Sequence, residues 1–65
     1  MTHYKPKTIT IAGVPFKIQY RSINDFGACD VDKKLITVRE SLSNQEKLET
    51  ILHESLHACL ALSGL

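Results

Sequence analysis

The first half of the chain alternates between polar and apolar residues, with the period of two that is typical of half-buried strands. Thr8–Ile11 and Phe16–Arg21 both show this alternation, and turn residues occupy Ala12–Pro15 between them, so this part predicts a β-hairpin. Ala28–Val31 predicts a short third strand. Leu35–Arg39 is rich in branched side chains and predicts a fourth strand.

The second half has the pattern of one helix. Ser43 and Glu46 fit a capping box at its start, and Gly64 is a natural stop at its end. At about 100° per residue, one side of this helix collects a stripe that we expect to pack on the sheet. The stripe consists of Leu48, Ile51, Leu52, Ser55, Leu56, Cys59 and Leu62. The sequence therefore predicts an α+β fold, in which a small, mostly antiparallel sheet of three or four strands precedes one long helix.

Length and charge narrow the class of protein. The 65 residues and the formal net charge of +1 fit a single domain over residues 1–65 and indicate neither a nucleic-acid partner nor a membrane partner. No apolar run is long enough to cross a bilayer, and the N-terminal residues lack the apolar stretch of a signal peptide. We therefore expect a cytoplasmic protein. Cys29 and Cys59 are too few for a disulfide scaffold.

The predicted helix contains the segment His53-Glu54-Ser55-Leu56-His57, which is an H-E-x-x-H motif. Residues four apart lie one turn apart on the same face, so both imidazoles can reach one metal ion, for which we expect Zn²⁺. Glu54 can then act as general base on a water molecule at that metal. A chain of this composition contains the motif by chance only roughly 0.008 times. The alternative interpretation is a pair of solvent-facing histidines, because both lie opposite the apolar stripe.

The motif resembles the active helix of zincin metallopeptidases. The segment from Leu35 to Ala58 is similar to the minimal zincins of the ImmA/IrrE type and to related small phage and prophage metallopeptidases, and the resemblance covers about residues 28–65. It implies that His53 and His57 are zinc ligands and that Glu54 is the general base and acid. It also implies a cytoplasmic protein or peptide as substrate, lying along Leu35–Arg39 as the edge strand of the sheet.

The third zinc ligand of such a site is not evident. Metzincins have a histidine six residues after the motif, where this chain has Ser63, and gluzincin-like families use a later helix that would lie beyond Leu65. Three sources stay open. We favour a segment that follows Leu65 in a longer protein, of which this chain would be a piece. A second copy in a homodimer is another source, and the third is an upstream residue folded back to the site: Asp30, Asp32, Cys29 or His3.

Other residues of the helix have plainer interpretations. Glu49 is either a solvated surface residue or a carboxylate that orients His53 from one turn away. We expect Thr50 at the surface and Cys59 in the core. Two functions from different classes follow. The first is a zinc-dependent peptidase, and the alternative is a non-catalytic zincin-like binding or regulatory module, with or without metal.

Overall fold

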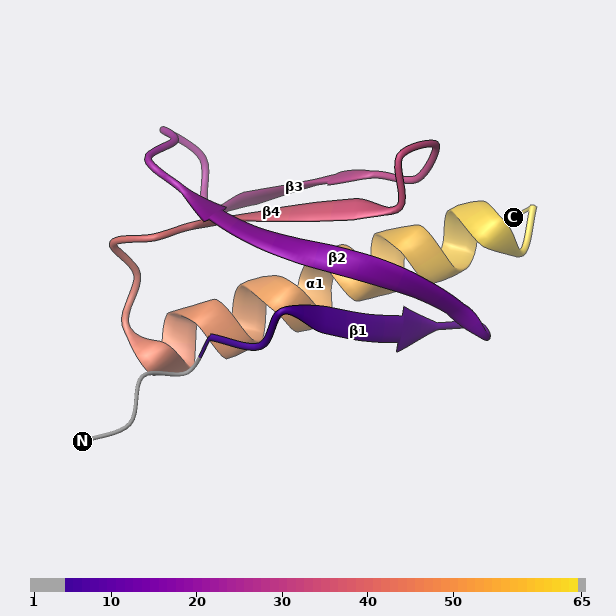
Figure 1. Ribbon diagram of the computed structural model, residues 1–65, viewed down its shortest axis with the longest axis horizontal. Helices are drawn as coiled ribbons and strands as arrows, with labels where there is room; N and C mark the ends of the chain where they lie inside the picture. The colour runs from indigo at the N-terminus through magenta and orange to yellow at the C-terminus, as the bar shows by residue number, and fades with distance from the viewer. Residues whose placement is uncertain (1–4, 65) are drawn as a thin grey trace.

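The computed structural model describes residues 5–64 and consists of four strands followed by one helix (Figure 1). The helix lies against one face of the sheet, and the other face is uncovered by these residues, so the α+β class is confirmed. In chain order the elements are β1 Thr8–Ile11, β2 Val14–Arg21, β3 Gly27–Asp30, β4 Leu35–Arg39 and α1 Asn44–Leu62. α1 makes only about five turns, so the expectation of a long helix was too generous.

The sheet is mixed and has the strand order β1-β2-β4-β3, which corrects the expectation of a mostly antiparallel sheet. β1 pairs with β2 and β3 pairs with β4 in antiparallel fashion, whereas β2 and β4 are parallel. The cause is the path of the chain, which crosses from the end of β2 to the far edge before β4 returns between them. Leu35–Arg39 is therefore a central strand and not the predicted edge strand, and the edge beside α1 is β3.

Short turns join the paired strands. Ala12 and Gly13 connect β1 to β2 with φ angles of 49° and 80°, the left-handed pair that a two-residue hairpin turn requires. The turn is thus shorter than predicted, and Val14 and Pro15 belong to β2. Between β3 and β4, Lys34 has a φ of 56° and its backbone N–H donates to the carbonyl oxygen of Val31 at 3.3 Å.

The helix begins where the sequence predicts. The Ser43 hydroxyl accepts a hydrogen bond from the backbone N–H of Glu46 at 3.2 Å, and the Glu46 carboxylate accepts one from the backbone N–H of Ser43 at 3.1 Å. This reciprocal pair is the predicted capping box. In the residues that the structure describes, α1 is the single helix, and it lacks the length and apolar content needed to cross a membrane.

The core lies between the sheet and α1 and is small. Its buried apolar side chains are Ile11, Phe16, Ile18, Ile36, Val38, Leu42, Ile51 and Ala58. The helix contributes a different face from the predicted stripe: Lys47, Thr50, Ile51 and Ala58 are buried, whereas Leu48, Leu52 and Leu56 are exposed. Ser55, Cys59 and Leu62 lie half-buried at its margin. The expected packing face is therefore wrong in its rotation about the helix axis.

The reason for this rotation is a close approach between β3 and α1 at Gly27. A Cβ atom at Gly27 would lie 2.6 Å from Cγ2 of Thr50 and 2.9 Å from the backbone oxygen of Thr37. Only glycine admits both neighbours, because real Cβ contacts of this length do not occur. Thr50 is consequently buried, with 6% of its surface exposed, and not at the surface as expected.

We predict that Gly27→Ala lowers the free energy of unfolding by about 1–3 kcal/mol, because the added methyl group forces β3 and α1 apart. Urea denaturation measures the change. Ala28→Ser is the matched control, since Ala28 is exposed on the same strand, and it should change stability by less than about 0.5 kcal/mol. A Gly27→Ala variant as stable as the parent would show that this contact does not set the spacing between strand and helix.

The capping box also predicts a pH dependence. The hydrogen bonds from the backbone and the hydroxyl of Ser43 hold the pKa of Glu46 below its ordinary value. A carboxyl group whose pKa falls on folding stabilises the protein above its unfolded pKa, and this contribution is lost as the pH falls. We expect the stability difference between the parent and Glu46→Gln to shrink between about pH 6 and pH 3 in urea titrations. An equal difference at both pH values would contradict this role.

Candidate metal centre

His53 and His57 lie one turn apart on α1, and their side chains converge. The two Nε2 atoms are 3.0 Å apart, and the rings are nearly perpendicular, with an interplanar angle of 83° and centroids 4.6 Å apart. Both side chains are exposed on the helix surface. The i, i+4 spacing thus brings two ring nitrogens to one point at the surface, as the sequence predicts.

The geometry of this pair fits a bound zinc ion. Zinc–nitrogen bonds of about 2.0–2.1 Å at a tetrahedral angle separate two ligand nitrogens by about 3.3 Å. The observed 3.0 Å differs from that value by only a few tenths of an ångström, so small rotations of the two rings would create the ligand spacing. Neutral imidazole is also the ligand type that zinc commonly takes in proteins.

The histidine pair by itself supplies two ligands. Within residues 5–64, no three His, Cys, Asp or Glu side chains lie close enough together to hold an ion. None of the upstream candidates within the described residues joins the histidine pair. Asp30 is exposed and accepts a hydrogen bond from the backbone N–H of Lys33 at 3.1 Å, and Asp32 is exposed in the same turn. His3 lies outside the described residues.

Among the upstream candidates, Cys29 lies on the side of β3 that faces the helix. It follows Gly27 by two residues, and alternate residues of a strand point to the same face. Burial raises the pKa of its thiol, and the negative charges of Glu54 and Asp30 raise it further. These surroundings favour the protonated thiol, whereas the thiolate is the form that binds metals. The Glu54 side chain also lies close to β3, since its Cγ atom is 3.6 Å from the position that a Cβ atom at Gly27 would take.

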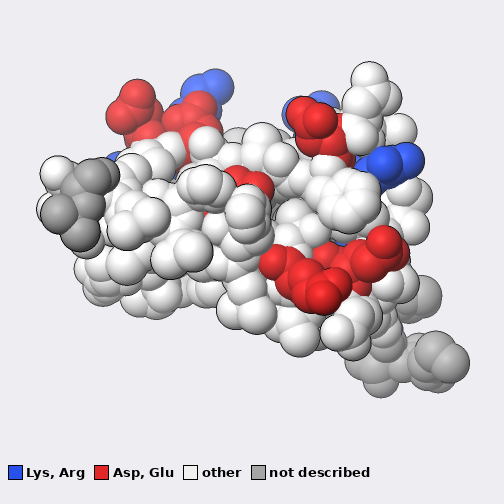
Figure 2. All heavy atoms as spheres, turned by 180° about the vertical axis from the view of Figure 1, so that it is seen from behind, with Lys and Arg blue, Asp and Glu red and all other residues white. Residues whose placement is uncertain are grey.

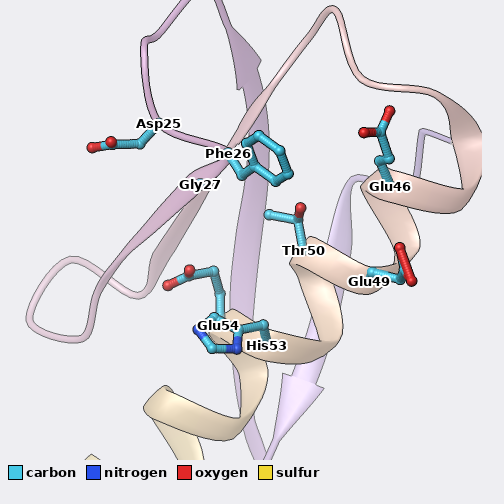
Figure 3. A pocket seen from close by; sticks show the side chains of 8 residues that line it. All are labelled: Asp25, Phe26, Gly27, Glu46, Glu49, Thr50, His53 and Glu54. Carbon is cyan, nitrogen blue, oxygen red and sulfur yellow. The ribbon is translucent and has the colours of Figure 1, made fainter.

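Glu54 occupies the space between the histidine pair and the edge strand. It is half-buried, and Figure 3 shows its side chain beside the His53 ring, below Thr50 and Gly27. His53 and Glu54 line a pocket of about 610 Å³ between α1 and the start of β3, whereas His57 lies outside it. A carboxylate placed beside an imidazole ring and open to a pocket is suited to accept a proton from a water molecule there.

The remaining lining of the pocket is acidic and aromatic. It consists of Asp25, Phe26, Gly27, Glu46, Glu49 and Thr50. Figure 2 shows acidic side chains gathered over the N-terminal part of the helix on this side of the molecule. Sequence reasoning missed Phe26, Gly27 and Thr50 as parts of the site. The sequence signal that could have revealed them is the glycine at the start of a strand, because such a glycine marks the close approach of another segment.

Comparison of the chain with known proteins adds no assignment. No protein-family model, no curated protein and no solved structure matches it.

Proposed function

We propose that this chain is a zinc-dependent metallopeptidase domain of the minimal zincin type. The observation that carries the proposal is the convergence of the His53 and His57 Nε2 atoms at 3.0 Å, beside a half-buried Glu54 in a pocket. The three residues of the H-E-x-x-H motif then have distinct tasks. His53 and His57 bind the metal, and Glu54 accepts and donates protons.

The reaction would be hydrolysis of a peptide bond. A bound zinc ion supplies Lewis acidity, which lowers the pKa of water and polarises the scissile carbonyl group. Glu54 accepts the proton of the attacking water and donates it to the nitrogen of the leaving amine. Its position beside His53, facing the pocket, suits both steps without a change in the helix.

The edge strand offers a way to bind the substrate. β3 pairs only with β4 among the described residues, and its start borders the pocket that holds Glu54. An extended peptide can add to such an edge through main-chain hydrogen bonds. We therefore place the substrate along Gly27–Asp30 and not along the central strand. The proposed substrate is a cytoplasmic protein or peptide, and the proposed location of the enzyme is the cytoplasm.

The alternative function is a non-catalytic binding or regulatory module. One observation favours it: Leu48, Leu52, Leu56 and Leu60 are exposed large apolar side chains on the same helix as the histidines. Apolar patches of this kind are typical of interaction surfaces. The two functions differ in whether Glu54 matters, because a binding module does not need a proton acceptor.

For the metal, we expect about one zinc ion per chain in purified protein, and none in the double variant His53→Ala/His57→Ala, measured by elemental analysis. Both histidines are exposed, so the double variant should fold. Cys29→Ser/Cys59→Ser is the control, and it should keep the metal. Zinc that persists without the histidines would contradict the proposed site.

For the reaction, we expect Glu54→Gln to lower the rate of peptide hydrolysis by about 10²–10⁴-fold while zinc stays bound, because the proton acceptor is gone. Cleavage of a defined peptide library, followed by mass spectrometry, measures the rate. Glu40→Gln is the matched control, since Glu40 is exposed and lies outside the pocket. Undiminished cleavage by Glu54→Gln would show that Glu54 is not the proton acceptor and would rule out this mechanism.

A further inference from the structure

The outer surface of α1 carries a continuous row of exposed leucines. Their exposed fractions are 39% for Leu48, 59% for Leu52, 59% for Leu56 and 43% for Leu60. The spacing of four residues makes them one ridge along the helix. Figure 2, which views the molecule from behind, shows a broad area without charged side chains next to a cluster of acidic ones. Soluble monomers rarely expose large contiguous apolar patches, and this molecule has only 4604 Å² of surface in total.

A second row runs directly beside the leucine row. Glu49, His53 and His57 also follow one another at intervals of four residues, and all three are exposed. On a helix, rows at this spacing are neighbouring parallel ridges with a groove between them. Any protein that covers the leucine row therefore comes within reach of the histidine pair.

We propose that a second copy of this chain covers the leucine row, and that Glu49 of the partner subunit completes the metal site of His53 and His57. The inference rests on the proposed zinc site. Two identical ridges interdigitate when their helices cross at about −50°, and a two-fold axis makes the surface complementary to itself. Each copy then gives the other a carboxylate, which is a regular zinc ligand beside two histidines.

The charges on α1 fix the direction of the pairing. The acidic residues of α1 lie in its first part, at Glu46, Glu49 and Glu54, whereas Ser55–Leu62 has no acidic residue and includes His57. A parallel pair would bring Glu49 against its own copy. An antiparallel pair brings Glu49 of each helix toward His57 of the other and away from the other Glu49, and it also sets the two helix dipoles in opposite directions, which is favourable.

The size of the surface predicts that metal controls the association. Standard protein interfaces bury about 800 Å² on each partner, and four half-exposed leucines provide a few hundred. Leucine contacts alone therefore give a weak dimer. A zinc ion that binds two ligands from one copy and one from the other stabilises the dimer only when both copies are present, so zinc binding and dimerisation are linked.

Sedimentation equilibrium of the full chain, in EDTA and in ZnCl₂, tests this linkage together with zinc analysis. We expect mostly monomer in EDTA and a dimer with two zinc ions in ZnCl₂. Glu49→Gln should raise the dimer dissociation constant in zinc at least tenfold, and Leu52→Gln/Leu56→Gln should do the same. These side chains are exposed, so circular dichroism should show unchanged folding. Glu40→Gln is the control and should dimerise like the parent.

The outcomes separate this inference from the proposed function. A monomer that binds zinc through His53 and His57 overturns the dimer and leaves the metallopeptidase proposal standing. A monomer that binds no zinc overturns both. A zinc-linked dimer that Leu52→Gln/Leu56→Gln does not weaken overturns the leucine surface, and one that Glu49→Gln does not weaken overturns the partner ligand.

Discussion

The contact between Gly27 on β3 and Thr50 on α1 decides how the helix sits on the sheet. A Cβ atom at Gly27 would stand 2.6 Å from the Thr50 methyl group, so a glycine is needed for the two elements to meet. This contact turns Thr50 and Ala58 into the interface and rotates three of the predicted stripe residues, Leu48, Leu52 and Leu56, outward. The close fit between Gly27 and Thr50 accounts for the rotation, which the apolar character of one helix face does not.

The same rotation of α1 determines where the residues of the candidate site lie. Glu54 lies one turn after Thr50 and therefore falls beside β3, where it lines the pocket. His53, one residue earlier, lies further from the sheet, and His57 follows it one turn later at the surface. The helix geometry alone thus places Glu54 between the histidine pair and the edge strand. The arrangement needs no special loop, which is how so short a chain can form it.

The sequence predicted local features well and tertiary ones poorly. Strand and helix periodicity, the capping box at Ser43 and Glu46, and the one-turn spacing of His53 and His57 are encoded in neighbouring residues. The strand order is not encoded in neighbouring residues. β4 pairs with β2 although β3 lies between them in the sequence, and the alternation within one strand does not identify its partner strands. Thr50 was misplaced for a similar reason, since a polar residue is buried only by a partner from elsewhere in the chain.

The central claim is that His53 and His57 bind one zinc ion together. X-ray absorption at the zinc edge of the metal-loaded protein tests it most directly, because it reports the ligand types and their distances. The account predicts two imidazole nitrogens at about 2.0–2.1 Å, together with oxygen ligands and no sulfur. A zinc–sulfur distance of about 2.3 Å, or a spectrum without imidazole scattering, would contradict it.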